Sequence, residues 1–214
     1  MENKFNSVRK DLKNRFDDID VMIGILCKEE KVNPQLLIKS SIILMIYNAV
    51  EGTFSNLLSD FFDFIVKKEI PLSKLPQRLQ ENILKYYINE INNNPTKLYN
   101  FHTLNEVELC SISYLDFCKY SNLFSGNLDS RQIRGVSQKL GVDLPNDLSS
   151  DSLLTVKKIR NELAHGEIKF STASQDLVLD KLKCIHCDVE KYLLDLIQEY
   201  EKFFDRLDIN NRTF

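Results

Sequence analysis

The spacing of apolar residues along the chain predicts three long helices. Between residue 2 and about residue 30, apolar side chains recur every three or four positions, which is the period of one face of an α-helix. Similar stripes predict a second helix from Pro34 to about Lys68 and a last one from a Ser174 cap to about Leu207. The three stripes consist of Phe5, Val8, Leu12, Phe16, Ile19, Ile23 and Leu26; Leu37, Leu44, Tyr47, Asn48, Glu51, Leu58, Phe62 and Ile65; and Leu177, Leu182, Ile185, Val189, Leu193, Leu196, Tyr200 and Phe203.

Prolines and asparagines mark the boundaries of the early helices. Asn33 before Pro34 is typical of a helix cap followed by the first helical position. Pro71 and Pro76 interrupt the pattern, after which residues 79–91 show a shorter helical period that ends at Asn92–Pro95. We therefore expect a break between the second long helix and a shorter third one.

The stretch from residue 96 to residue 126 has the least regular pattern, and two interpretations stay open for it: helix, or a small hairpin inserted over the bundle. The segment that follows is clearer. Asp129 or Ser130 is a candidate cap for a helix that ends at Gly141.

Residues 155–166 predict the last turns of a further helix, which begins near Asp151. At about 100° per residue, its apolar positions fall on one side of the helix. Gly166 follows the last of these positions, where a glycine in the left-handed conformation commonly ends a helix. The apolar positions are Leu153, Val156, Ile159 and Leu163.

Three polar residues gather near the end of this helix. Arg160 lies at the edge of the apolar side, while Asn161 and His165 are four residues apart and share the neighbouring face. An Arg, an Asn and a His thus converge at one helix end and could reach one ligand together, which is more than a helix cap requires. The structural alternative is that His165 only complements the helix dipole and that Arg160 only pairs with a buried acid.

Glu51 is the candidate for that acid, because it lies within the apolar stripe of the second helix. An unpaired buried carboxylate is energetically costly. We therefore expect Glu51 to be buried and to pair with Arg160 or with another polar group of the 151–166 helix. The glycine that follows it, Gly52, is expected to let a neighbouring backbone approach.

Composition favours a helical protein and indicates in which cellular compartment it is found. The chain has 214 residues, of which 43% are hydrophobic, with only 6 Gly and 5 Pro, so we expect one all-α domain over residues 1–214. The charged N-terminal residues argue against a secretory signal, and the apolar run from Leu36 to Val50 is too short and too polar to span a bilayer. Five cysteines without framework spacing suit a reducing compartment. We expect a cytoplasmic protein that does not interact with membranes.

Charge restricts where a nucleic acid would bind. A formal net charge of −3 argues against general coating of the surface with positive charge, but not against a local basic cleft. The candidate phosphate contacts near the Arg/His pair are Lys157, Lys158, Lys169, Arg131 and Arg134. No phosphate-binding glycine loop is present, and no cofactor is indicated. Cys184, His186 and Cys187 lie within one helix and lack the four-ligand spacing of a zinc site, so we expect no metal.

Three segments of the chain resemble the HEPN superfamily, in particular its MAE-type branch, which lies near the proteins named RiboL-PSP. Arg160-Asn-Glu-Leu-Ala-His165 resembles the Arg-(four to six residues)-His signature, with the polar residue that usually follows the Arg. Ile42-Ile-Leu-Met-Ile-Tyr-Asn-Ala-Val-Glu51-Gly-Thr-Phe resembles the early helix of that branch. Ser125-Gly-Asn-Leu-Asp129 and the following residues to Arg134 resemble its intervening segment. The resemblance implies a HEPN-type bundle of long antiparallel helices with a less regular insertion around residues 96–126.

HEPN proteins are commonly metal-independent ribonucleases and often toxins or phage-defence effectors. The resemblance therefore implies RNA cleavage by Arg160 and His165, with Asn161 orienting the substrate or His165. It also implies a homodimer that pairs two motifs across a cleft, and a possible antitoxin or second defence protein as partner. In one branch the toxin is nucleotidylated on a Tyr two residues after the His, but Glu167 occupies that position here. The alternative function is a non-catalytic HEPN module that binds nucleotide, RNA or a protein partner.

Overall fold

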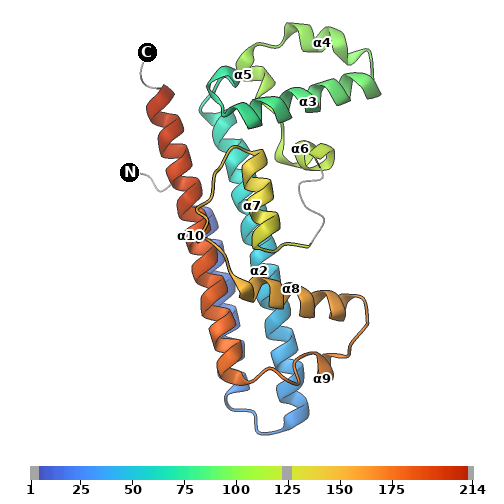
Figure 1. Ribbon diagram of the computed structural model, residues 1–214, viewed down its shortest axis with the longest axis vertical. Coiled ribbons are helices and arrows are strands. Elements are labelled where there is room, and N and C mark those ends of the chain that lie inside the picture. The colour runs from blue at the N-terminus through green and yellow to red at the C-terminus, as the bar shows by residue number, and fades with distance from the viewer. Residues whose placement is uncertain (1–4, 122–126, 212–214) are drawn as a thin grey trace.

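In a computed structural model, which describes residues 5–121 and 127–211, the long helices form an upright bundle (Figure 1). Helix α1 (Asn6–Leu26) runs antiparallel to α2 (Val32–Lys67) and to α10 (Leu179–Asn211). The described parts of the chain contain helices and no strand, which confirms the all-α prediction. The shorter elements are the 3₁₀ turn Leu72–Lys74, α3 (Gln77–Asn93), α4 (Lys97–Thr103), α5 (Glu106–Leu109), α6 (Tyr114–Ser121), α7 (Ser130–Lys139), α8 (Asp151–Ala164) and α9 (Phe170–Ala173).

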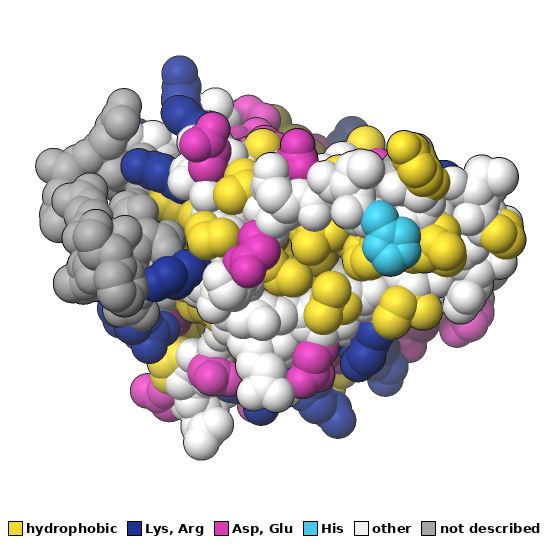
Figure 2. Space-filling view, turned by 90° about the horizontal axis from the view of Figure 1, so that it is seen from above, with side chains coloured by type: hydrophobic (Ala, Val, Ile, Leu, Met, Phe, Trp, Pro, Cys, Tyr) yellow, Lys and Arg dark blue, Asp and Glu magenta, His cyan; other side chains and the backbone are white. Residues whose placement is uncertain are grey.

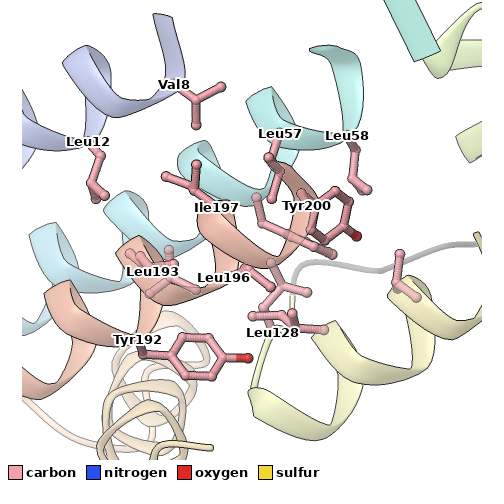
Figure 3. Close-up of a cluster of buried hydrophobic side chains, with 14 of the residues drawn as sticks. Val8, Leu12, Leu57, Leu58, Leu128, Tyr192, Leu193, Leu196, Ile197 and Tyr200 are labelled. Atoms are coloured by element: carbon pink, nitrogen blue, oxygen red, sulfur yellow. The ribbon is translucent and has the colours of Figure 1, made fainter. Parts of the chain in front are cut away.

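Helix α2 is the central element of the bundle, with contacts to α1, α6, α8, α9 and α10. Among the described residues, it is the one helix long and apolar enough to cross a membrane by length and composition. In this fold its buried apolar side chains, among them Ile43, Phe54 and Phe61, pack against the surrounding helices. Figure 3 shows part of this core, where side chains from α1, α2 and α10 meet, among them Val8, Leu12, Leu57, Leu58, Leu193, Leu196 and Ile197.

Because α2 has neighbours on several sides, the single stripe predicted for it is only partly right. Asn48 is exposed, and Leu37 keeps 47% of its surface in contact with solvent, although both were assigned to the buried stripe. Buried residues such as Ile42, Ile43 and Val50 fall outside the stripe. By contrast, the stripes of α1 and α10 are buried as predicted, since each of these helices presents one face to the core.

Two predicted helix starts are wrong. Helix α2 begins at Val32, so Asn33 is not its cap and Pro34 occupies the third helical position. This is tolerated because the first N–H groups of a helix have no intrahelical acceptor. Ser174 does not cap α10, which begins at Leu179; its hydroxyl is buried and donates to the carbonyl of Leu36 at 2.9 Å.

The region from residue 96 is helical as far as it is described, which decides between the two interpretations left open for it. Helices α4, α5 and α6 follow α3 at the end of α2 that lies away from α8 and α9 (Figure 1). Residues 122–126 lie outside the described part. Seen from above, this end shows hydrophobic side chains gathered among polar ones (Figure 2), and its exposed apolar residues include Leu84, Ile88, Leu98, Tyr99 and Leu115.

Helix α7 ends as its sequence predicts. Asp129 is the N-cap, with its carboxylate accepting from the N–H of Gln132 at 2.9 Å. At the other end Gly141 has φ +79°, and the N–H of Val142 donates to the carbonyl of Ser137 at 2.9 Å, which closes a Schellman motif. A Cβ on Gly141 would lie 2.4 Å from the Cβ of Pro76, so the position also allows a close contact.

Two substitutions of glycine by alanine in this region should have opposite effects on stability. Gly141→Ala should lower the free energy of unfolding by at least about 1–2 kcal/mol, the usual cost of a left-handed conformation for a residue with a Cβ. Gly135→Ala, in the middle of α7 with nothing within 4 Å of the new Cβ, should raise it by about 0.5–1 kcal/mol. Urea unfolding of the two variants and the parent measures both. Equal effects of the same sign would contradict the backbone assignment at Gly141.

Candidate functional site

Helix α8, which carries Arg160, Asn161 and His165, is fixed firmly at its N-terminus. Ser150 is the N-cap: its hydroxyl accepts from the N–H of Leu153 at 3.3 Å and donates to Oδ2 of Asp188, on α10, at 2.6 Å. Ser130 of α7 donates to the carbonyl of Ser150 and accepts from its N–H, each at 3.1 Å. The start of α8 is thereby tied to both α7 and α10.

The other end of α8 closes with a second Schellman motif. Gly166 has φ +70°, as predicted, and its N–H donates to the carbonyl of Leu163 at 3.2 Å. The N–H of Glu167 donates to the carbonyl of Glu162 at 2.9 Å. His165 is therefore the C-cap residue, and its side chain is exposed to solvent.

The guanidinium of Arg160 is held from three sides. Its Cζ lies 4.6 Å from the centre of the Tyr47 ring, and Nη1 donates to Oδ1 of Asn161 at 2.9 Å. Nη2 lies 3.9 Å from Oε1 of Glu51, so the expected pairing of these two side chains is present as a long ion pair. The prediction that Glu51 is buried is wrong, because its side chain and that of Arg160 each keep 27% of their surface exposed.

Tyr47 links this cation to the segment before α7. Its hydroxyl accepts from the buried N–H of Leu128 at 3.0 Å. Burial, and then the negative charge of Glu51 and a hydrogen bond to that carboxylate, raise the pKa of Tyr47 to about 12. Tyr47 therefore stays protonated near neutral pH, and its hydroxyl serves Leu128 as acceptor and Glu51 as donor.

Residues 127–129 lie against α8 with alternating side chains. Asn127 accepts from Nδ2 of Asn161 at 2.7 Å, and Asp129 forms an ion pair with Lys157 at 2.8 Å. Lys157 and Asn161 are four residues apart, so they lie on one face of α8. Leu128, between the two polar residues, is fully buried and belongs to the hydrophobic core (Figure 3). Burial opposes ionisation of Asp129, but the Lys157 ammonium and the N–H of Gln132 together hold the pKa of that carboxyl below its usual value.

Two of the candidate phosphate contacts are engaged inside the protein. Lys157 is only 19% exposed in its ion pair with Asp129. Arg134 donates to the carbonyls of Leu144, Pro145 and Leu148 at 2.6, 2.8 and 2.9 Å, so it holds the loop before α8. Both residues were predicted from charge alone, which does not reveal an internal acceptor.

The remaining basic candidates lie on the surface. Lys158 keeps 75% of its side-chain surface exposed and lies 3.9 Å from Glu162. Lys169, at the N-cap of α9, and Arg131, near the start of α7, are also exposed. These three cations are accessible to a ligand in solution.

Other features of the sequence have structural explanations. The guanidinium of Arg15, rather than a backbone, approaches Gly52, where a Cβ would lie 2.8 Å from its Cζ. His186 is buried against Phe16, with Nε2 3.3 Å from Oδ1 of Asp20 but without hydrogen-bond geometry. All five cysteines are free thiols. Within the described residues, no group of three or more His, Cys, Asp or Glu side chains is placed to hold a metal ion.

Arg160 and His165 point in different directions from α8. They are five positions apart, which corresponds to about 7.5 Å along the helix axis and about 140° around it. Arg160 faces Tyr47 and Glu51 on α2, whereas His165 is exposed at the free end. Asn161 contacts Arg160 and Asn127, not His165. One copy of the chain therefore offers the two catalytic candidates on different sides of one helix.

Sequence reasoning placed Tyr47 only in the buried stripe of the second helix, where it is found, and assigned no role to Asn127. Both lie in segments that resemble the HEPN superfamily, Tyr47 within the early helix and Asn127 within Ser125-Gly-Asn-Leu-Asp129. What the sequence lacks is the information that these segments meet at Arg160, because the contacts join positions far apart in the chain.

Replacing Glu51 by Ala should lower the free energy of unfolding by about 1–2 kcal/mol, because the buried Tyr47 hydroxyl loses its acceptor and Arg160 loses its counter-ion. Glu162→Ala is a matched control: Glu162 is 29% exposed and lies 3.9 Å from Lys158. Because that partner is solvated, the control should change stability by less than about 0.5 kcal/mol. Urea unfolding compares the two variants, and equal stabilities would show that Glu51 does not support the site.

Comparison with known proteins adds one finding to this geometry. The chain matches the MAE-like HEPN family over residues 5–209, and this span includes every residue of the site. No curated protein and no solved structure gives a match. The resemblance found in three separate segments is thus confirmed by a match over nearly the whole sequence, and the chain belongs to the MAE-like HEPN family.

Proposed function

We propose that this protein is a metal-independent endoribonuclease in which Arg160 and His165 carry the reaction. HEPN domains are often ribonucleases, which sets the class of reaction. The observation that carries the proposal is the contrast between the two side chains. Arg160 is held on the ring of Tyr47 and against Asn161, while His165 is exposed at a helix end whose backbone is fixed.

The chemistry of RNA cleavage without a metal fits these residues. The ribose 2′-oxygen forms a bond to phosphorus while the bond from phosphorus to the 5′-oxygen breaks. One proton leaves the 2′-hydroxyl and another is delivered to the 5′-oxygen. The imidazole of His165 can accept or donate a proton in this reaction. Arg160 offers a planar set of N–H donors to the phosphate as negative charge develops on it. The products are a 2′,3′-cyclic phosphate and a 5′-hydroxyl.

The active unit in this proposal is a homodimer. Because Arg160 and His165 point about 140° apart, a second copy of α8 would supply the side chains that one copy cannot bring to the same phosphate. Leu154 supports this arrangement: it lies on the same face of α8 as Asn161 and His165, and 47% of its surface is exposed. Lys158, also on that face, would add positive charge at the cleft.

Asn161 has a different role in this proposal from the one expected. Its carbonyl oxygen accepts from Arg160 and its amide donates to Asn127, so it orients Arg160 rather than His165. We place the enzyme in the cytoplasm, as a single domain that acts as a toxin or phage-defence effector. A neutralising or activating protein partner belongs to the same proposal.

His165→Ala and Arg160→Ala should each lower the rate of RNA cleavage by about 10²–10⁴-fold or more, because a proton-transfer group and the phosphate-binding cation are lost. Purified protein is incubated with mixed cellular RNA in EDTA, and the ends of the products are analysed. Cleavage should persist in EDTA and stop at a 2′-deoxy position. His102→Ala, an exposed histidine on α4, is the control and should cleave like the parent.

Equal activity of the parent and His165→Ala would point to another site or to a contaminating nuclease. A parent that binds RNA without cleaving it would favour the alternative, a non-catalytic HEPN module.

The protein should be a dimer in solution at micromolar concentration, and Leu154→Asp should shift it toward the monomer, because a charge at an apolar contact must be desolvated. Val21→Asp is the control, since Val21 is 64% exposed on α1 and lies outside this face. Light scattering gives the mass of each sample. A parent that stays at the 25.0 kDa of one chain would contradict the proposal.

A further inference from the structure

We propose that Asn127 and Tyr47 are positioning residues for Arg160, so that the extended segment 127–129 is part of the active centre. This rests on the proposed function, because it assigns the supports of the phosphate-binding cation. Both residues lie far from Arg160 in sequence. Tyr47 contacts the Arg160 guanidinium directly, and Asn127 acts on it through its hydrogen bond with Asn161.

The first argument concerns the orientation of the Asn161 amide. A guanidinium has only donors, so it requires the carbonyl side of Asn161. Asn127 fixes that choice, because its Oδ1 accepts from Nδ2 of Asn161 at 2.7 Å. With the amide held this way, Oδ1 of Asn161 faces Nη1 of Arg160 at 2.9 Å. Without Asn127, the amide is free to turn its donor side toward Arg160 and repel it.

The second argument concerns the plane of the guanidinium. The ring of Tyr47 lies under it at 4.6 Å, a distance at which the negative face of the ring attracts a cation. The ring itself is fully buried, and its hydroxyl is bonded to the N–H of Leu128. Arg160 thus packs on a ring that is held both by its burial in the core and by the hydrogen bond of its hydroxyl.

The contacts of Asn127 with Asn161 and of Leu128 with Tyr47 are coupled, since Asn127 and Leu128 are adjacent in the chain. The contacts form a closed circuit that runs from Tyr47 to Arg160, Asn161, Asn127 and Leu128, and then back to Tyr47. Asp129 fastens the segment to α8 once more through Lys157 at 2.8 Å. A displacement of the segment would therefore move the guanidinium both through Asn161 and through Tyr47, and a misplacement of about 1 Å can cost about 100-fold in rate.

Kinetic constants separate positioning from simple charge effects. Asn127→Ala should lower kcat by about 10- to 100-fold, the loss expected for a displacement of about 1 Å. Asn127→Asp keeps an acceptor for Asn161 and should restore kcat to within about threefold of the parent, while its added negative charge raises KM for RNA. Tyr47→Phe keeps the ring but not the acceptor for Leu128, and should also lower kcat. Asn146→Ala, an exposed loop asparagine, is the matched control and should change neither constant.

A second measurement follows Arg160 without any need for cleavage. The ¹⁵N NMR signal of its Nε–H group, assigned by comparison with Arg160→Lys, reports how rigidly the side chain is held. In the parent and in Asn146→Ala the group should be rigid. In Asn127→Ala it should become mobile on the picosecond to nanosecond timescale, and Asn127→Asp should restore its order.

The outcomes distinguish the two proposals. An Arg160 signal in Asn127→Ala that is as rigid as in the parent overturns the positioning role, whatever the activity. A parent that does not cleave RNA overturns the proposed ribonuclease function, and the NMR comparison still decides whether Asn127 positions Arg160. Mobility of Arg160 in Asn127→Ala that is lost again in Asn127→Asp supports the inference.

Discussion

A helix surrounded by other helices has few places for a polar group, and this constraint on α2 determines much of the structure. Burial of a polar side chain is tolerated when another element satisfies it. Ser40 donates to the carbonyl of Phe170 at 2.7 Å, and Tyr47 accepts from Leu128. Glu51 interacts with both Tyr47 and Arg160. Within the described residues, Thr53 is the exception on this helix, since its buried hydroxyl finds no hydrogen-bond partner.

Each of these polar positions fixes a short element to the long bundle. Ser40 and Ser174 hold the turn that includes α9, while Tyr47 and Glu51 hold the start of α7 and the middle of α8. The candidate site thus lies where polar groups of the core find their partners. The same contacts that remove the cost of buried polar groups on α2 also set the position of Arg160. Stability and site geometry therefore have a common origin in this region.

The sequence predicted the features that depend on local chemistry. The stripes of α1 and α10 are visible as a period in the chain because each helix buries one face, and Gly141 and Gly166 are visible because a positive φ favours glycine. The pairing of Glu51 with Arg160 followed from the cost of a charge in an apolar stripe. Family membership followed from three spaced segments. The all-α bundle was expected from the helical periods, from the composition and from the same resemblance.

Features that depend on distant partners were not predictable in this way. From the sequence, Lys157 is expected to be a surface cation, but in the fold it pairs with Asp129. Ser174 is expected to cap a helix, but in the fold its hydroxyl bonds to Leu36 and Ser40. The single stripe on α2 failed because a helix with several neighbours buries more than one side, so its buried residues do not follow one period. Tyr47 and Asn127 needed the tertiary fold to gain any role at all.

The position of α10 has a consequence for the order in which parts of the protein fold during synthesis. Chains emerge from the ribosome N-terminus first, and contacts between distant residues form only when both have appeared. Leu193, Leu196 and Ile197 of α10 complete the core against α1 and α2 (Figure 3), and Asp188 anchors the start of α8. Until α10 has been synthesised, the core is open and α8 lacks that anchor. The fold therefore delays closure of the core, and the last anchor of the helix that carries Arg160 and His165, until α10 has been synthesised.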